Sequence, residues 1–319
     1  MPTLQRAPTR EYRTLSLDSH RWDGFAPRDG DIVIATHPKC GSTWMQRIID
    51  LLVFQSPEPR PIKQTSPVLE SAVGAPAAAV LDRLEAQTHR RFIKTELPFD
   101  ALPVWSGVSY IHVGRDGRDM CWSMHNHVLG FRPEIQRMRA ELAAQDPRFK
   151  VRFPEPPTDP RTLFLEWIAE AEADGPVGFG ADLPFFEFET TFWRERRRPN
   201  LLFVHYADLK ADLAQEMRSI SEFLQIDTPE SLLVELARAA SFETMKLQGD
   251  AILPGLDIGF DRGVDRFINQ GVNGRWQGVL TASDLERYDA LVQRKFTPAQ
   301  AAWTEHGRRV VGDPRDLQD

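Results

Sequence analysis

The sequence predicts an α/β fold in which a mostly parallel central sheet is flanked by helices on both faces. Three observations support this class: short apolar runs recur along the chain, helical patterns lie between them, and residues 36–44 form a turn between the first run and the first helix. Strands that alternate with helices usually form parallel sheets covered on both sides. A chain of 319 residues could hold two domains, but α/β folds of this size often have one core, so we predict a single domain over residues 1–319.

The predicted strands are apolar, β-branched runs bounded by Pro, Gly, Asp or Asn. They cover residues 31–36, 91–95, 108–114 and 201–206. Continuous apolar runs of this kind are typical of buried parallel strands. In such sheets ligands bind beyond the carboxyl ends of the strands, which is where residues 36–44 fall.

Helices are predicted where apolar residues recur at three- and four-residue spacing. The apolar face of the first helix consists of Trp44, Ile48, Leu51 and Leu52. Asp208 can cap a second helix over residues 208–224. Two more helices are predicted near the C-terminus, over residues 281–296 and 297–307.

Composition and charge indicate a globular protein and limit its partners. Hydrophobic residues make up 41% of the chain and charged residues 27%, which suits a protein with a substantial core. Lys and Arg number 39 and Asp and Glu 46, so the net charge of −7 disfavours binding to nucleic acid or acidic membranes. An anionic ligand therefore requires a local cationic site. Two cysteines, Cys40 and Cys121, do not fit a disulfide scaffold or a four-ligand zinc site.

Two segments are predicted to be more mobile than the rest. Residues 1–20 lack the apolar core of a signal peptide, and we predict a flexible N-terminal segment there. Residues 130–184 contain Pro- and Gly-rich stretches and indicate a mobile insertion, either a solvated excursion or a lid over an acceptor pocket. No apolar run is long enough to span a membrane, and we predict a cytoplasmic location.

The turn at residues 36–44, THPKCGSTW, has the features of an anion site. Gly41 lets backbone amides approach a ligand without a Cβ in the way. A helix that starts near Ser42 presents N–H groups without intrahelical partners and the positive end of its dipole. Lys39 adds a full charge, and Ser42 and Thr43 add hydroxyl groups. We therefore predict a phosphate site; the alternative is an ordinary strand-to-helix turn capped by serine.

The same stretch resembles the loop that binds the 5′-phosphosulfate in the cytosolic-type sulfotransferases, commonly YPKSGTTW. Cys40 and Ser42 replace a serine and a threonine of that loop, and the residues that match it are Lys39, Gly41, Thr43 and Trp44. The nucleotide loop of kinases, GxxxxGK[ST], is absent, which disfavours a nucleotide kinase. The resemblance implies a P-loop-like fold and places residues 39–44 against the nucleotide.

Four further segments resemble that family's nucleotide-binding elements, in the same order along the chain. In the first, Arg115 ends a strand and Ser123 follows eight residues later, as in the family's 3′-phosphate element. Taken alone, Arg115 beside Asp116 and Asp119 also fits a surface ion-pair cluster. The other implied neighbours of the nucleotide are Tyr206, Ser241, Phe242, Met245, Phe267 and Gly271.

The resemblance implies transfer of a sulfuryl group from 3′-phosphoadenosine 5′-phosphosulfate (PAPS) to an acceptor, with adenosine 3′,5′-bisphosphate (PAP) as the product. The implied acceptor is a small molecule with an alcohol, phenol, lipid or sugar hydroxyl. Lys39 is implied to be catalytic by stabilising charge on the leaving phosphate oxygen, without a metal ion. The sequence leaves the acceptor and the oligomeric state open.

The first departure from the family is the segment KTELP, where the family has KTHLP with histidine as the base. Lys94 and Glu96 are two residues apart in an extended segment and therefore share a face. Glu96 can act as the catalytic base, with Lys94 beside it, as a glutamate does in other sulfotransferase branches. Alternatively the two form only an ion pair, and the base is His89, His112 or His125, or there is none.

The second departure lies at Asn269 and Gln270, where the family has an arginine and a lysine that bind the 3′-phosphate. The loss of two charged contacts, each worth about 1.5–3 kcal/mol, weakens discrimination for that phosphate. Arg262, Arg266 or Arg275 could compensate. The two departures keep a second function open, a catalytically impaired protein of the sulfotransferase fold that binds a ligand.

Overall fold

Four parallel strands form the central sheet, in the spatial order β3–β2–β5–β6. The computed structural model describes residues 1–145, 155–173 and 183–319. The strands are β2 (Ile32–Ala35), β3 (Phe92–Thr95), β5 (Ser109–Gly114) and β6 (Leu201–His205). Each falls within a predicted run, and every pairing between them is parallel, which confirms the predicted fold class.

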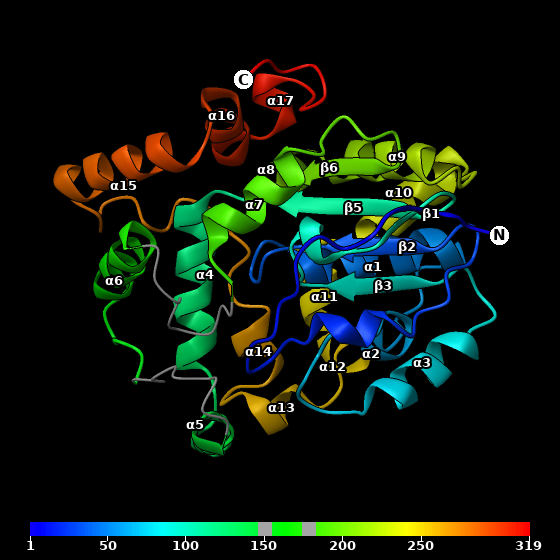
Figure 1. The fold of residues 1–319 in the computed structure, drawn as a ribbon, viewed down its shortest axis with the longest axis horizontal. Helices are drawn as coiled ribbons and strands as arrows, with labels where there is room; N and C mark the ends of the chain where they lie inside the picture. The colour runs from blue at the N-terminus through cyan, green and yellow to red at the C-terminus, as the bar shows by residue number, and fades with distance from the viewer. Residues whose placement is uncertain (146–154, 174–182) are drawn as a thin grey trace.

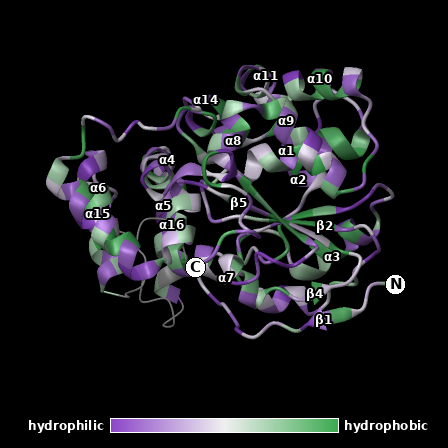
Figure 2. Ribbon diagram, turned by 90° about the horizontal axis from the view of Figure 1, so that it is seen from above, coloured by the Kyte–Doolittle hydropathy of each residue, from purple (hydrophilic) through white to green (hydrophobic). Residues whose placement is uncertain are grey.

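Helices cover both faces of the sheet, as predicted. Side chains alternate along a strand, so Ile32 and Ile34 of β2 join one apolar cluster and Val33 and Ala35 join another. The isoleucine face packs against α1 (Ser42–Phe54), α9 (Leu213–Phe223) and α10 (Glu230–Ala239). The opposite face packs against α3 (Ala77–Glu85), α7 (Phe185–Trp193) and α16 (Pro298–His306). Figure 2 shows the apolar strands between these two layers.

A third group of helices lies beyond the carboxyl ends of the strands. It comprises α4 (Gly117–Leu129), α5 (Pro133–Gln145), α6 (Pro160–Glu172) and α15 (Ala282–Lys295). In Figure 1 the arrowheads of β3 and β5 point toward α4. Helices α4, α6 and α15 share an apolar cluster of their own, so this end of the sheet is enclosed by packed structure.

The predicted insertion at residues 130–184 contains α5 and α6, while its residues 146–154 and 174–182 lie outside the described residues. Helix α6 is packed: Phe164 and Trp167 are buried, and Arg161 donates two hydrogen bonds to Asp284 of α15, at 2.7 and 3.0 Å. The sequence prediction missed this helix because its apolar positions lie between two Pro-rich or Gly-rich stretches. The described part of the segment therefore includes a packed helix, and its mobility stays a prediction.

Residues 1–20 contact the domain, whereas the sequence predicts a flexible segment. Strand β1 (Leu4–Arg6) pairs with β4 (Val104–Trp105) in an antiparallel arrangement. Leu15 and Leu17 are buried, and the short helix η1 (Ser19–Trp22) ends on a buried tryptophan. These apolar side chains, together with the strand pairing, give the segment specific contacts that a polar tail would lack.

The two helices predicted at the C-terminus are confirmed, but residues 208–224 do not form one helix. Helix α8 (Tyr206–Ala211) ends before α9, because Asp212 leaves the helical conformation and its side chain accepts a hydrogen bond from the N–H of Gln215. The remaining helices are η2 (Phe99–Ala101), α2 (Ile62–Thr65), α11 (Phe242–Leu247), α12 (Gly249–Ile252), α13 (Leu256–Gly259), α14 (Val264–Phe267) and α17 (Arg308–Val311). Within the described ranges, every helix is too short or too polar to traverse a bilayer.

Candidate active site

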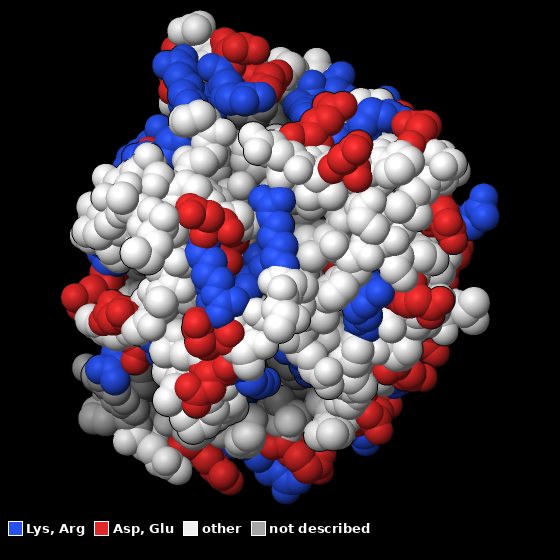
Figure 3. Space-filling model, turned by 90° about the vertical axis from the view of Figure 1, so that its right-hand side faces the viewer, with Lys and Arg blue, Asp and Glu red and all other residues white. Residues whose placement is uncertain are grey.

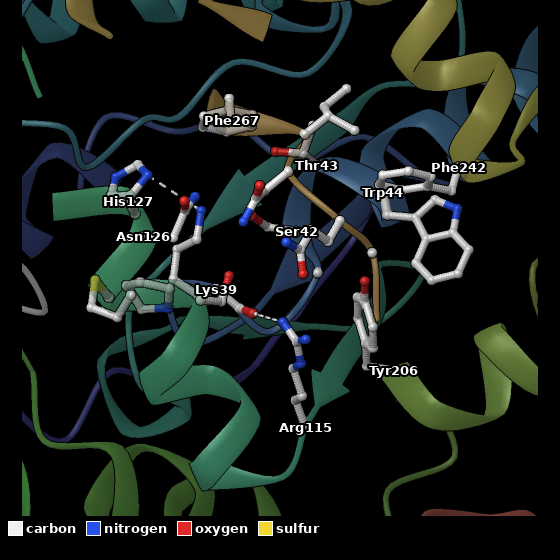
Figure 4. A pocket seen from close by; sticks show the side chains of 18 of the residues that line it. Lys39, Ser42, Thr43, Trp44, Arg115, Asn126, His127, Tyr206, Phe242 and Phe267 are labelled. Carbon is white, nitrogen blue, oxygen red and sulfur yellow. Dashed lines mark hydrogen bonds between the residues drawn. The ribbon is translucent and has the colours of Figure 1, made fainter. Parts of the chain in front are cut away.

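A pocket of about 380 Å³ opens where the turn after β2, the second half of α4 and the loop after α14 come together. All the predicted site residues except Cys40 and Ser241 line it. They are Lys39, Gly41, Ser42, Thr43, Trp44, Lys94, Glu96, Arg115, Ser123, Tyr206, Phe242, Met245, Phe267, Asn269, Gln270 and Gly271. In Figure 4, Ser42 and Thr43 lie between a side formed by Lys39, Asn126 and His127 and a side formed by Trp44, Tyr206 and Phe242.

The turn after β2 has the backbone that a phosphate-binding loop requires. Lys39 and Gly41 have positive φ angles of 69° and 113°, which bend the chain sharply before α1 begins at Ser42. A Cβ at Gly41 would lie 3.0 Å from a ring carbon of Tyr206, so both the φ angle and the space favour glycine. The N-cap residue, Gly41, has no side chain to cap the N–H groups of the first helical turn, and Ser42, Thr43 and Trp44 of that turn line the pocket.

Lys39 places its ammonium group inside the pocket. Its Nζ lies 3.3 Å from Nδ1 of His127 and 4.8 Å from the ring centre of Phe267. Burial, with the nearby charges of Lys94 and Arg115, lowers the pKa of Lys39 to about 8. Burial of His127, with the charge of Lys39, lowers the pKa of its imidazole well below the usual range, so the ring is neutral and Nδ1 can accept a hydrogen bond from the lysine ammonium.

Arg115, at the end of β5, joins two walls of the pocket. Its guanidinium donates to the carbonyl of Lys39 at 2.9 Å and to Oδ1 of Asn273 at 3.0 Å, and it lies 4.0 Å from the ring centre of Tyr206. The alternative of an ion-pair cluster does not apply to Arg115 among the described residues. Asp116 pairs with Arg118 instead, at 2.5 Å, and Asp119 accepts the N–H of Gly274.

Aromatic side chains form the wall opposite Lys39. Trp44 donates its Nε1–H to the carbonyl of Ala240 at 2.8 Å and meets Tyr206 edge to face, with ring centres 5.3 Å apart. Phe242 lies against Gly271, where a Cβ would overlap its ring. Flat apolar surfaces of this kind suit a nucleotide base.

Two predicted nucleotide neighbours lie outside the pocket wall. The side chain of Cys40 is fully buried, and burial raises the pKa of its thiol well above the usual value. Ser241 is the N-cap of α11 and accepts the N–H of Thr244 at 3.2 Å. Both residues are adjacent in sequence to residues that do line the pocket. The sequence motif alone could not distinguish a residue that lines the pocket from its buried or capping neighbour.

Lys94 and Glu96 share one face at the end of β3, as the strand alternation predicts. Nζ of Lys94 donates to Glu96 at 2.6 Å, and both side chains line the pocket while Thr95 is buried on the other side. The backbone N–H of Glu96 donates to the buried carboxylate of Glu70 at 2.7 Å. Burial raises the pKa of Glu70, which also accepts the indole N–H of Trp22 at 3.1 Å. The backbone beside the candidate base is therefore held in place.

The histidine in the pocket is one that the sequence analysis did not name. His89 packs against Phe54, His112 is buried against Glu189, and His125 binds the carbonyl of Pro157; none of these three lines the pocket. His127 does. It follows Ser123 by four residues on α4, and this one-turn spacing could have identified it.

The pocket is far more cationic than the molecule. Its cationic residues are Lys39, Lys94, Arg115, Arg139, Lys210 and Arg275, and Glu96 is the sole acid among the described lining residues. The whole chain has a net charge of −7, and acidic and basic side chains are interspersed over the face at the amino ends of the strands (Figure 3). Lys210 follows Tyr206 by one helical turn, a spacing that could have predicted it. The arrangement can bind a polyanion.

Comparison with known proteins gives close sequence matches over nearly the whole chain. The family described as the sulfotransferase domain matches residues 29–300. A glycolipid sulfotransferase of Mycobacterium bovis is 35% identical over 313 residues, which cover 93% of this chain and 94% of that protein. Sulfotransferase 1B1 of Mus musculus is 27% identical over 292 residues, which cover 88% of each protein.

Solved structures show the same fold. A mouse sulfotransferase in complex with PAP matches with a TM-score of 0.60 and 22% identity, over 88% of this chain and 89% of that one. Retinol dehydratase in complex with androsterone and PAP matches with a TM-score of 0.64 and 18% identity, over 88% of this chain and 84% of that one.

Proposed function

Because the chain belongs to the sulfotransferase domain family, we propose that it transfers the sulfuryl group of PAPS to a hydroxyl of a small or lipidic acceptor and releases PAP. One observation carries this function: residues from segments far apart in the sequence line a single cationic pocket above a strand-to-helix turn with a lysine. The donor fits this pocket chemically, since it combines a flat adenine base with a 3′-phosphate and a 5′-phosphosulfate on its ribose. Neighbouring structures with bound PAP support the choice of nucleotide.

Each group of pocket residues has its own role in the proposed reaction. The first turn of α1 and Arg115 hold phosphate groups, and Trp44, Tyr206 and Phe242 face the base. Lys39 stabilises the negative charge on the leaving phosphate oxygen as the sulfur–oxygen bond to the phosphate breaks and a new one to the acceptor forms. Glu96 takes the acceptor proton, with Lys94 holding its carboxylate in place at 2.6 Å.

The acceptor is proposed to be a hydroxyl on an alcohol, phenol, lipid or sugar. Besides Lys94 and Glu96, the pocket lining combines polar groups, including His127 and Asn126, with the apolar surfaces of Met124, Phe267 and Ile268. Such a mixed lining suits an acceptor with a polar group on an apolar body. The glycolipid sulfotransferase name of a relative that is 35% identical favours glycolipids as the first acceptors to test.

A transfer assay tests this function. The purified protein is incubated with PAPS and a panel of phenols, alcohols and glycolipids, and both PAP and the sulfated product are measured by mass spectrometry. We expect equal amounts of PAP and sulfated product with at least one acceptor. Binding of PAP without transfer to any acceptor would instead identify a catalytically impaired binding protein. Failure to bind PAP would overturn both readings.

A further inference from the structure

We infer that Arg275 binds the 3′-phosphate of the nucleotide and, together with Arg115, selects a nucleotide that carries two phosphate groups over one that carries a single 5′-phosphate. The inference rests on the proposed function. It concerns the loop after α14, where Asn269 and Gln270 line the pocket but carry no charge.

The loop after α14 is held on both sides of Arg275. Before it, Oδ1 of Asn273 accepts a hydrogen bond from Arg115 at 3.0 Å, and the N–H of Gly274 donates to Asp119 at 2.7 Å. After it, Trp276 lies under the guanidinium of Arg118, 4.2 Å from the ring centre. Arg275 therefore extends into the pocket from a backbone that is fixed at both neighbouring positions.

Arg115 and Arg275 both line this pocket. Burial lowers the pKa of Arg275, and the charge of Arg115 lowers it further, so the two cations lie within each other's field. The carboxylate of Asp119 is nearby but is engaged by the N–H of Gly274. In the described part of the chain, no ion pair joins either arginine to a carboxylate, and the buried Nε of Arg115 has no hydrogen-bond partner. Repulsion between these cations would be relieved by a dianion between them, which is the chemistry of a phosphate monoester.

The other two arginines considered from the sequence do not reach the pocket. Arg266 pairs with Asp261 at 2.6 Å and donates to Asn126 at 3.2 Å. Arg262 is exposed, and neither residue lines the pocket. Of these three arginines, Arg275 alone contributes to the described lining of the pocket. Arg262 lies on the same stretch of chain outside the pocket and therefore serves as a matched control.

The test is calorimetric titration of the full-length protein with PAP and with adenosine 5′-monophosphate, for wild type, Arg275→Ala, Arg275→Lys and Arg262→Ala. We expect wild type to prefer PAP by tenfold or more. Arg275→Ala is expected to lower that preference about tenfold, equal to about 1.4 kcal/mol, with unchanged affinity for the monophosphate. Arg275→Lys should restore part of it, because it keeps the charge but loses the two-pronged geometry. Arg262→Ala should match wild type.

The possible failures are distinguishable. If wild type prefers PAP and Arg275→Ala keeps that preference, the role of Arg275 is wrong and the proposed function stands. If Arg275→Ala weakens both nucleotides equally, the arginine supports the fold of the pocket and does not select the 3′-phosphate. If wild type binds both nucleotides equally, the 3′-phosphate is not read at all. If wild type binds neither, the proposed function itself fails.

Discussion

The pocket has two halves that treat charge differently. The proposed nucleotide half comprises Ser42, Thr43, Arg115, Tyr206 and Arg275. Among the described residues, neither arginine pairs with a carboxylate, and Arg115 donates to the carbonyl of Lys39 and to the amide oxygen of Asn273. The proposed acceptor half comprises Lys94, Glu96 and His127. Its charged groups have partners: Nζ of Lys94 donates to Glu96 at 2.6 Å, and Nζ of Lys39 lies 3.3 Å from Nδ1 of His127.

This difference separates binding from chemistry. Cations without carboxylate partners gain most when an anion arrives, so the nucleotide half is built for affinity. A carboxylate held by a lysine and a neutral histidine beside an ammonium group can exchange protons, so the acceptor half is suited to acid–base work. Lys39 touches both halves, because its carbonyl binds Arg115 and its Nζ binds His127.

Removing the Lys39 side chain should impair both halves of the pocket at once. Lys39→Ala is expected to lower kcat/KM about 10³-fold, since the leaving oxygen loses its cation in a partly buried site. Steady-state assays with PAPS measure this effect, and circular dichroism checks the fold. Lys63→Ala removes an exposed lysine outside the pocket and should behave as wild type. Near-normal turnover by Lys39→Ala would contradict the role of this residue.

Changing Glu96 should affect the acceptor half alone. Glu96→Gln keeps the shape but cannot take a proton, so turnover is expected to fall about 10²-fold while PAP affinity stays the same. Calorimetry and initial rates on one protein preparation separate the two effects. Glu243→Gln, an exposed residue on α11, serves as the control. An unchanged rate would transfer the role of base to His127 or to solvent.

The pH profile should reveal the state of Lys39. Burial, with the charges of Lys94 and Arg115, brings its pKa from 10.5 down to about 8, so the folded protein loses this positive charge as the pH rises through that value. We expect kcat/KM for PAPS, which reports on the free enzyme, to fall about tenfold between pH 7 and pH 9. A profile that stays flat to about pH 9.5 would show that Lys39 keeps the pKa of an exposed lysine.

Replacing His127 should have the smallest effect and sharpens the boundary between the halves. His127→Phe removes the hydrogen-bond acceptor 3.3 Å from Lys39 and keeps an aromatic ring. The KM for the acceptor substrate is expected to rise about fivefold, in line with the loss of one hydrogen bond, while the affinity for PAP changes less than about twofold. His306→Phe, at an exposed position, is the control. A fall of about 10²-fold in kcat would instead identify His127 as the base.

Much of the site could be predicted because its motifs are local. The turn at residues 36–44 needs only a buried strand, Gly41 and a helix start, and all of these are adjacent in the sequence. Lys94 and Glu96 share a face because strand geometry alternates side chains. His127 and Lys210 were within reach of the same reasoning, since each lies one helical turn after a predicted site residue.

The sequence by itself determined the parallel sheet, its strands and the turn at the edge where ligands bind, because these depend on periodicity and on neighbouring residues. Tertiary structure alone decided that residues 1–20 pack through Leu15 and Leu17, and that Arg275, rather than Arg262 or Arg266, lines the pocket together with Arg115. These outcomes depend on contacts between residues more than a hundred positions apart, such as Arg115 with Asn273 and Asp119 with Gly274. Side-chain packing and charge pairing at that range follow from the assembled fold, and no local pattern contains them.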